Sequence, residues 1–471
     1  MICMNLLEIA EAVDGKLVND AWSAIEVSGS VETDSRLVSA GSLFVAKPGE
    51  VTDGHNFVEQ AMHAGAVAAI VQRELPIDFP QILVGDSVLA IGRLAKSVLA
   101  DLRAAGKLRV VGVTGSNGKT TTKNMLREIL SRSGETVAPI ESYNNEVGAP
   151  YSILRCTEST EFLVVEMGAD GLGSIGYLTD IAKPDVAVEL KVGLAHVGEF
   201  GGIETTAKIK AELIEGLSPG AIAILNHDDG YVREMGDRTS NQTFWFGTTA
   251  DCELWADEIS VGLDGTSFKA HWSDGAARTV KLQILGEHHI MNALASLSVA
   301  DVLGLDRETS CQALEAMPLA ERWRMQVTKL ANGIHIINDA YNASPDSTKA
   351  ALQTLAHIGR GKHRTIAVLG EMAELGEFSR EQHDAIGRVV VRLNIDQLVV
   401  VGEAAKLIHL GAMQEGSWDG ESVYFDSASD AESYLRGMLE PNDLVLVKSS
   451  KSANLRYLGD RLCDESLEVG S

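Results

Sequence analysis

Cysteine is scarce in this sequence and is not arranged in pairs. Five cysteines occur in 471 residues, at positions 3, 156, 252, 311 and 463, and no two stand as C-x-x-C. The spacing argues against a zinc site, which usually needs closely spaced cysteine pairs, and the low count argues against a disulfide framework. We therefore expect reduced, mostly buried thiols in a cytosolic protein.

Features of exported and membrane proteins are also missing. The first twelve residues carry Glu8 and Glu11 and no basic residue, which does not resemble a secretory signal. No apolar run approaches the roughly 18 residues that a membrane-spanning helix needs. Internal repeats and low-complexity tracts are absent as well. We expect a cytoplasmic chain that is not inserted in a membrane.

Positive charge is in deficit. Lysine and arginine number 40 against 66 acidic residues, so the formal net charge is −26. A field of this sign repels the phosphates of nucleic acids and of anionic lipids, and it argues against nucleic-acid partners. It does not forbid one local phosphate site.

The length and the pattern of apolar runs predict an α/β protein of three domains. We expect a mixed α/β domain over residues 1–107, in which a helix from residue 57 runs through Gly65 into a strand. A second domain, residues 108–316, has strands at 108–113, 162–166, 185–190 and 221–225 with helices between them, which is typical of a parallel sheet. Residues 250–284 alternate like antiparallel strands around a turn at Asp264-Gly265, and a helix follows at 288–303.

The third domain is expected over residues 317–471. Met317-Pro318 breaks the preceding helix and is the expected linker. Strands at 334–338, 365–369, 397–401 and 443–447 alternate with helices, which predicts a Rossmann-like, doubly wound sheet.

Residues 112–122 read G-V-T-G-S-N-G-K-T-T-T and join an apolar strand to an amphipathic helix. The usual phosphate-loop pattern needs a first glycine where Val113 stands. A glycine turn that merely caps a helix is the alternative. However, Gly118-Lys119-Thr120 falls where backbone amides, a lysine and a helix N-terminus meet an anion, so we favour a nucleotide site. The Thr120 hydroxyl is then a candidate Mg²⁺ ligand.

Two further side chains follow apolar strands. Glu166 ends one strand and is placed to hold Mg²⁺, directly or through water, although an exposed acidic turn is equally compatible with its position. His196 follows the next strand between glycines. Lone histidines are more often structural, but the position at a strand end favours a functional role.

These residues resemble the Mur ligase family of ATP-dependent, amide-forming enzymes of peptidoglycan synthesis, whose loop T-G-x-x-G-K-T lacks the first glycine. The resemblance covers essentially the whole chain. Several stretches are similar to the member that adds D-alanyl-D-alanine to UDP-N-acetylmuramoyl-tripeptide. They are residues 33–36, 41–46, 53–57, 144–150, 166–168, 195–212, 286–293, 339–347 and 369–377.

The resemblance implies a role for each matching residue. Loop residues Gly115, Ser116, Asn117, Gly118, Lys119, Thr120 and Thr121 would bind ATP, together with Asn292 at the adenine and Arg324 and Asp339 from the last domain. Lys119, Lys210, His196 and Arg324 would be catalytic. Thr120 and Glu166 would hold one Mg²⁺, and His196 with Lys210, modified to a carbamate, would hold a second. Lys208 is the rival for the carbamate. Ser35, Arg36, Asn144 and Asn145 would bind the UDP-substrate.

The implied reaction makes an amide through an acyl phosphate, with ADP and phosphate as products. We expect a monomer whose two nucleotide-binding domains close over ATP around a hinge near Met317–Glu321.

The sequence departs from the family at a few positions. Glu189 and Lys191 stand where an aliphatic residue and an asparagine are usual, His289 replaces a frequent asparagine, Ser344 replaces an asparagine, and Lys448–Lys451 reads K-S-S-K. Two alternatives stay open. One is another ligase of the superfamily, such as the diamino-acid-adding or folylpolyglutamate type. The other is a degenerate member that binds ATP without turnover.

Overall fold

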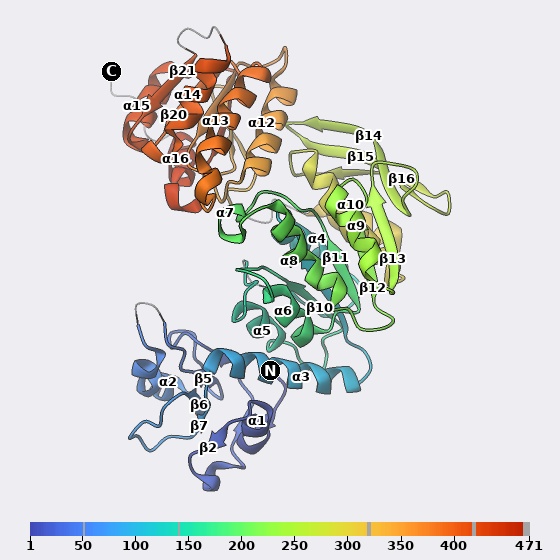
Figure 1. Cartoon of the computed structure of the whole chain (residues 1–471), viewed down its shortest axis with the longest axis vertical. Coiled ribbons are helices and arrows are strands. Elements are labelled where there is room, and N and C mark those ends of the chain that lie inside the picture. The colour runs from blue at the N-terminus through green and yellow to red at the C-terminus, as the bar shows by residue number, and fades with distance from the viewer. Residues whose placement is uncertain (50–51, 140–141, 318–321, 417–420, 465–471) are drawn as a thin grey trace.

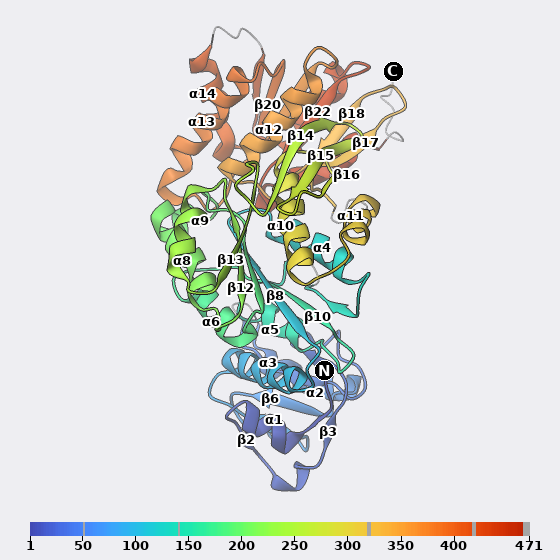
Figure 2. The same ribbon diagram turned by 90° about the vertical axis from the view of Figure 1, so that its right-hand side faces the viewer.

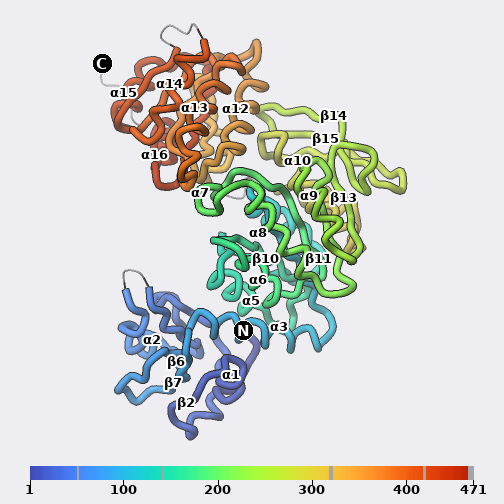
Figure 3. Tube along the Cα trace, viewed as in Figure 1, coloured from blue at the N-terminus to red at the C-terminus, as the bar shows by residue number. Residues whose placement is uncertain are grey.

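The computed structural model describes residues 1–49, 52–139, 142–317, 322–416 and 421–464. Three α/β parts follow one another along the long axis of the molecule, with the N-terminal part at one end and the C-terminal part at the other (Figures 1 and 3). Each part has its own main sheet, as the sequence predicts. The exact domain boundaries stay predictions.

The N-terminal part is built on a sheet that, within the described residues, has five strands in the order β2-β7-β6-β5-β4. All its pairs are parallel except β2–β7. Gly65, with φ of +110°, ends helix α2 and turns the chain into β6, which confirms the predicted helix–glycine–strand order. Its elements are β1 (Met4–Asn5), α1 (Leu6–Ala12), β2 (Lys16–Leu17), η1 (Asp20–Trp22), β3 (Glu26–Val27), β4 (Val31–Glu32), β5 (Leu43–Val45), η2 (Gly54–Phe57), α2 (Val58–Ala64), β6 (Ala68–Val71), β7 (Gln81–Leu83) and α3 (Ser87–Ala104).

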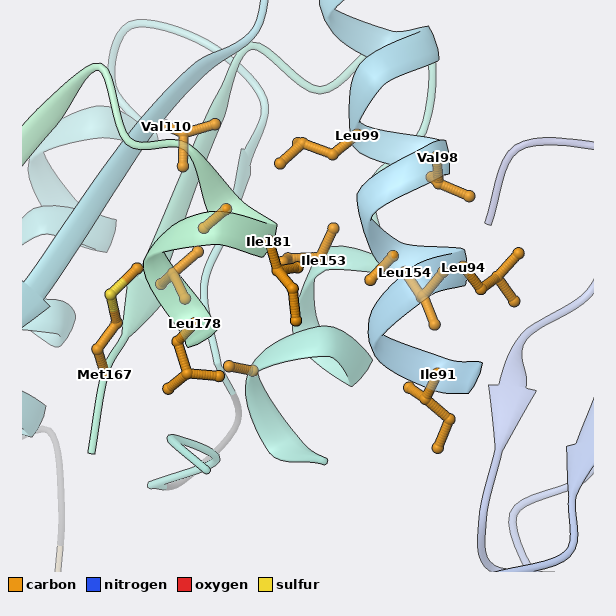
Figure 4. Packing of buried hydrophobic residues seen from close by; sticks show 14 of the residues in the cluster. Ile91, Leu94, Val98, Leu99, Val110, Ile153, Leu154, Met167, Leu178 and Ile181 are labelled. Carbon is orange, nitrogen blue, oxygen red and sulfur yellow. The ribbon is translucent and has the colours of Figure 1, made fainter. Parts of the chain in front are cut away.

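Helix α3 joins the N-terminal part to the central part. Asp86 caps its first turn, and buried apolar residues cover two sides of it. Figure 4 shows Ile91, Leu94 and Leu99 of this helix beside side chains of the central part, among them Ile153 and Ile181. Because one apolar cluster spans both parts, their relative position is fixed by burial rather than by a loose linker.

The central part holds the largest sheet. Its order among the described residues is β16-β15-β14-β13-β12-β11-β8-β10-β9, parallel from β9 to β14 and antiparallel from β14 to β16. The predicted parallel strands, the antiparallel segment and the helix near 288–303 are all present. The elements are β8 (Arg109–Thr114), α4 (Lys119–Leu130), β9 (Thr136–Val137), α5 (Gly148–Ile153), β10 (Phe162–Glu166), α6 (Ser174–Ala182), β11 (Val186–Glu189), α7 (Val197–Phe200), α8 (Ile203–Glu215), β12 (Ile222–Asn226), α9 (Gly230–Met235), η3 (Gly236–Arg238), β13 (Gln242–Gly247), β14 (Leu254–Gly262), β15 (Gly265–Trp272), β16 (Ala277–Leu282), α10 (His288–Val302) and α11 (Arg307–Ala316).

The C-terminal part has a doubly wound sheet of order β17-β18-β22-β19-β20-β21 where the chain is described, parallel except for β17–β18. The four predicted strands are β18, β19, β20 and β22. The elements are β17 (Gln326–Lys329), β18 (His335–Asn338), α12 (Pro345–Gly359), β19 (Thr365–Leu369), η4 (Gly376–Phe378), α13 (Ser379–Arg392), β20 (Gln397–Val401), η5 (Glu403–Ala405), α14 (Lys406–Glu415), β21 (Ser422–Phe425), α15 (Ala428–Met438), β22 (Leu444–Lys448), η6 (Lys451–Ala453) and α16 (Leu455–Leu462).

The C-terminal part packs directly on the central part. Val197 of α7 and Leu285 belong to the same buried apolar cluster as the C-terminal core. Figure 2 shows hairpin β14–β15 lying beside α12. Of the predicted hinge, residues 318–321 lie outside the described residues, and Met317 is buried.

All five cysteines are free thiols. Among the helices that the structure describes, none is long and apolar enough to span a lipid bilayer.

Candidate active site

The glycines of the phosphate loop are required by the local backbone. The loop leaves β8 at Thr114 and enters α4 at Lys119, and Gly118 is the N-cap with φ of +90°. A Cβ on Gly118 would overlap the Oδ1 atom of Asn292, and a Cβ on Gly115, whose φ is +144°, would lie 2.9 Å from Leu190 Cβ. Both conformations disfavour side chains. The glycines therefore let the loop backbone present its amides at the N-terminus of α4. That is the geometry of an anion site.

The loop is tied to the strand end next to it. Ser116 N–H donates to Lys191 O at 2.7 Å, and Gly193 N–H donates to Ser116 Oγ at 2.9 Å. Lys119 Nζ donates to Gly115 O at 2.7 Å, so its ammonium lies over the loop. Burial lowers the pKa of Lys119, while Glu166 and Glu189 act in the opposite direction. Thr121 is half-buried in the first turn of α4.

Glu166 ends β10 beside the first turn of α4. Its Oε1 accepts from Asn144 Nδ2 at 2.9 Å and from Thr120 Oγ1 at 3.3 Å. Its Oε2 is buried and has no hydrogen-bond partner among the described residues. Unsatisfied buried carboxylate oxygens are costly, so this atom fits a bound cation. Thr120 and Glu166 thus suit Mg²⁺, which commonly takes few protein ligands and completes its shell with phosphate and water.

His196 and Lys210 approach the same region from α7 and α8. His196 caps α7 with φ of +60°, and burial lowers its pKa. Its Nδ1 lies 2.7 Å from Glu374 Oε2 of the C-terminal part. Lys210 is 3% exposed and its Nζ donates to Thr114 Oγ1 at 3.5 Å, whereas Lys208 is exposed. Burial and the charge of Lys119 lower the pKa of Lys210.

No group of three acidic, histidine or cysteine side chains with metal-site geometry occurs within the described ranges. A cation held by Thr120 and Glu166, or by His196 and Lys210, would therefore need further oxygen ligands from the substrate.

The adenine-side candidates lie on α10. Asn292 is buried, and its Nδ2 lies 3.3 Å from His289 Nδ1. Burial lowers the pKa of His288 to about 4 and lowers that of His289 well below its usual value. Both rings are therefore neutral at pH 7, which favours stacking and hydrogen bonding over charge attraction.

The C-terminal part contributes charged groups to the site. The Arg324 guanidinium lies 4.2 Å from the centre of the Tyr341 ring, and its charge acts on Lys119 and His289. Asp339 accepts from Lys448 Nζ at 2.6 Å and from Met325 N at 3.0 Å. Lys448, the first residue of the K-S-S-K stretch, thus fixes a predicted nucleotide ligand.

Two direct contacts close the C-terminal part on the loop region. Ser344 Oγ donates to Asn117 Oδ1 at 3.3 Å, and Leu194 N–H donates to Asp346 Oδ2 at 2.9 Å. Sequence reasoning matched Ser344 and Asp346 to a motif without assigning them these contacts, since no local pattern encodes a partner some 150 to 230 positions away.

Of the predicted UDP-substrate residues, Asn144 belongs to this cluster through its bond to Glu166, whereas Ser35, Arg36 and Asn145 make their contacts elsewhere. Ser35 and Arg36 belong to the N-terminal part, where Ser35 Oγ donates to Gln60 and Arg36 pairs with Asp34 at 2.6 Å. Asn145 Oδ1 accepts from Gly148 N at the start of α5. Asn145 also lines a cavity of about 280 Å³ between the start of α3 and residues 168–178.

A second cleft, of about 650 Å³, lies between α4 and β9 of the central part and the C-terminal part. We call it the basic cleft. Its described lining contains no acidic residue, although the whole chain carries a charge of −26. Its cationic and aromatic lining residues are Lys123, Arg127, Arg155, Arg322, Lys451, Arg456, Trp323, Tyr341 and Tyr457.

Comparison with known proteins places the chain in a family. Residues 29–103 match the Mur ligase family, catalytic domain; residues 113–300 match the Mur ligase middle domain; residues 323–451 match the Mur ligase, glutamate ligase domain. The chain is 40% identical to UDP-N-acetylmuramoyl-tripeptide--D-alanyl-D-alanine ligase of Mycobacterium leprae, with 98% of each chain covered.

Two solved structures are similar over nearly the whole chain. MurF from Acinetobacter baumannii has a TM-score of 0.90 and 31% identity, covering 98% of this chain and 99% of its own. MurF ligase from Thermotoga maritima in complex with ADP has a TM-score of 0.82 and 30% identity, covering 94% and 98%. The three-domain α/β fold, the phosphate loop and the full-length identity all lead to one conclusion: the chain belongs to the Mur ligase family.

Proposed function

We propose that this protein is the ATP-dependent ligase that joins D-alanyl-D-alanine to UDP-N-acetylmuramoyl-tripeptide. The products are UDP-N-acetylmuramoyl-pentapeptide, ADP and phosphate, in the synthesis of peptidoglycan precursors. The observation that carries the proposal is the 40% identity, over 98% of both chains, to a ligase with this named reaction. The candidate phosphate and metal side chains Lys119, Thr120, Glu166, His196 and Lys210 are all present around the loop, which supports turnover rather than a scaffold role.

The first step makes an acyl phosphate. A carboxylate oxygen of the tripeptide attacks the γ-phosphorus of ATP, and the bond between that phosphorus and the β,γ-bridging oxygen breaks to release ADP. Two anions must meet, so the protein has to offset their repulsion. Lys119 and the amides from Gly115 to Thr121 would bind the β- and γ-phosphates, and Arg324 would stabilise charge on the transferring group.

Mg²⁺ would neutralise the phosphates when it is bound. Thr120 and Glu166 would hold one ion, and the unpartnered Glu166 Oε2 supports that assignment. His196 and Lys210 are the proposed protein groups for a second ion. Asn144, which donates to Glu166, would orient its carboxylate in addition to its proposed substrate contact.

Around the nucleotide, we propose that Asn292 contacts the adenine. The Asp339 carboxylate, fixed by Lys448, would face the ribose region. Ser35, Arg36 and Asn145 are the proposed contacts of the UDP-sugar, with the 280 Å³ cavity at the start of α3 as its place in the central part.

In the second step the dipeptide amine attacks the acyl carbon. A tetrahedral intermediate forms and collapses, and inorganic phosphate leaves with the C–O bond electrons. The basic cleft supports a place for the dipeptide carboxylate. Lys123 lies one helical turn beyond Lys119, and the cationic groups of Arg324 and Lys451 lie 4.2 and 5.7 Å from the centre of the Tyr341 ring. Cationic side chains there would match one carboxylate.

The acyl phosphate must be shielded from water. Contacts between the C-terminal part and residues 117 and 194 would close the site during this step. We propose that the enzyme acts as a monomer, in the cytoplasm where its substrates would be made.

The test measures ADP release by purified protein with Mg-ATP and UDP-N-acetylmuramoyl-tripeptide, with and without D-Ala-D-Ala, and identifies the product by mass. Pentapeptide formation that requires both substrates is the expected result. Lys119→Met should lower the rate by about 100-fold or more, because a phosphate-binding cation is lost. ATP binding without turnover in the unmodified protein would refute the proposal.

A further inference from the structure

Lys191 is attached to the phosphate loop through its backbone. It follows the end of β11 by two residues, and its carbonyl oxygen accepts from Ser116 N–H at 2.7 Å. A Cβ on Gly115 would lie 3.2 Å from Lys191 N. The position of Lys191 is therefore fixed against the loop that would bind the β- and γ-phosphates, although the reaction steps described above give its side chain no role.

The Lys191 side chain lines a third cleft, of about 810 Å³, between the central part and the C-terminal part. His288 and Met291 of α10 line this cleft on the central side, and residues of α12 line it on the C-terminal side. His288 lies one helical turn before Asn292, the proposed adenine contact. Burial is the main cause of the low pKa of His288, and the charge of Lys191 lowers that pKa further. Lys191 therefore lies between the phosphate loop and the adenine side of the site.

No carboxylate pairs with the Lys191 ammonium within the described residues. The side chain is exposed and forms no ion pair there within 4 Å. Three acidic side chains near it each accept a backbone N–H instead. They are Asp228, Asp229 and Asp346, which accept from residues 248, 192 and 194. The Lys191 ammonium is therefore available to an anion that enters the cleft.

A nucleotide that spans the loop and α10 would bring one phosphate close to Lys191. The β- and γ-phosphates would lie on the loop amides and the adenine would contact Asn292, so the α-phosphate and the ribose must lie between them. A phosphate oxygen accepts the hydrogen bonds that an ammonium donates. We propose that Lys191 binds the α-phosphate of ATP and thereby adds to the nucleotide affinity of this protein. This inference rests on the proposed nucleotide site.

The test measures dissociation constants of ADP, AMP and adenosine in the absence of magnesium, by competition against a fluorescent N-methylanthraniloyl derivative of ADP. Lys191→Met should weaken the binding of ADP and of AMP by roughly 10-fold each and that of adenosine by less than about twofold, because one charged hydrogen bond to a phosphate is lost. Lys191→Arg should retain most of the affinity. Lys349→Met, which removes a cation from the α12 wall of the same cleft, is the matched control and should bind all three ligands as the unmodified protein does.

Unchanged binding of ADP and AMP in Lys191→Met would overturn the inference. A loss confined to ADP would also overturn it, because the lysine would then contact the β-phosphate. An equal loss for adenosine, or an equal loss in Lys349→Met, would overturn it by showing a distorted site or a general effect of charge. None of these readouts requires ligase turnover, so a protein that binds ADP through Lys191 but makes no pentapeptide would refute the proposed function and leave this inference standing.

Discussion

His196 Nδ1 lies 2.7 Å from Glu374 Oε2, and this contact joins the central part to the C-terminal part. Gly198 N–H also donates to the Glu374 carbonyl oxygen at 3.3 Å. His196 and Glu374 both have positive φ, 60° and 64°, which non-glycine residues adopt at a cost. His196 is therefore both a proposed metal ligand and part of the contact between the two domains.

Glu374→Gln should raise the Mg²⁺ concentration needed for half-maximal ligase rate by roughly 10-fold. A carboxylate beside Nδ1 favours the proton on that nitrogen and leaves the Nε2 lone pair for a cation, and loss of such partners typically costs 10- to 100-fold. Glu377→Gln, on the same loop and exposed, is the control. An unchanged Mg²⁺ dependence in Glu374→Gln would show that the contact does not orient His196.

Gly198→Ala should oppose domain closure without removing a functional group. A Cβ on Gly198 would overlap the backbone of Leu375 and Gly376. We expect a larger radius of gyration by solution scattering with an ATP analogue and UDP-tripeptide, and a ligase rate reduced by roughly 100-fold, since small misplacements at a reacting site have effects of this size.

Gly437→Ala is the control for that experiment. Gly437 lies within α15, where an added Cβ meets no atom within 4 Å. It should leave closure and rate unchanged while stabilising the helix by up to about 1 kcal/mol. Equal scattering profiles for Gly198→Ala and the unmodified protein would contradict the expected opening.

Lys451→Met should reduce discrimination between D-Ala-D-Ala and its C-terminal amide. If the basic cleft binds the carboxylate, the unmodified protein should prefer the free acid by roughly 10- to 100-fold in kcat/KM, as expected for a charged hydrogen bond. The ratio should approach one in Lys451→Met and stay unchanged in Lys329→Met, whose lysine is exposed in the same domain. A preference retained in full by Lys451→Met would place the carboxylate elsewhere.

Stability of the C-terminal part should fall on acidification because of His383. This ring is 0% exposed, its Nε2 accepts from Met372 N at 3.0 Å, and its Nδ1 lies 2.7 Å from Ser379 O. Burial lowers its pKa below 6.5 in the folded protein. The stabilisation is therefore complete above pH 6.5 and is lost as pH falls through the folded-state pKa, with a slope of at most about 1.4 kcal/mol per pH unit.

The measurement compares thermal midpoints at about pH 7.5 and about pH 5.5. His383→Gln, which can accept from Met372 without titrating, should show a smaller drop than the unmodified protein. Equal drops in the two proteins would assign the acid sensitivity to other groups.

Most helices and strands could be predicted from local sequence patterns. Strand β8, the loop and α4 follow from apolar runs broken by Gly115 and Gly118, and hairpin β14–β15 follows from alternation around Asp264-Gly265. Strands β13, β17 and β21 were not predicted. β17 and β21 are partly exposed edge strands whose weak apolar pattern is satisfied only by pairing with a neighbour.

The candidate site could be predicted where its functional residues are adjacent in the sequence, as in Gly118-Lys119-Thr120. It was not predictable where residues from two domains meet. The bond from Leu194 to Asp346 and the contact of His196 with Glu374 depend on how the domains pack, and no local pattern encodes that packing. Glu189 was recognised in the sequence as an unusual acidic residue at the end of a strand. That its side chain is completely buried could be seen only in the structure.

The basic cleft has one wall in each domain, with Arg127 and Arg155 on the central side and Lys451 and Arg456 on the C-terminal side. A compound that contacts both walls would leave only after the domains separate. Its residence time would then be set by the opening rate of the protein rather than by the strength of its own contacts, so a weakly bound inhibitor placed here could still dissociate slowly.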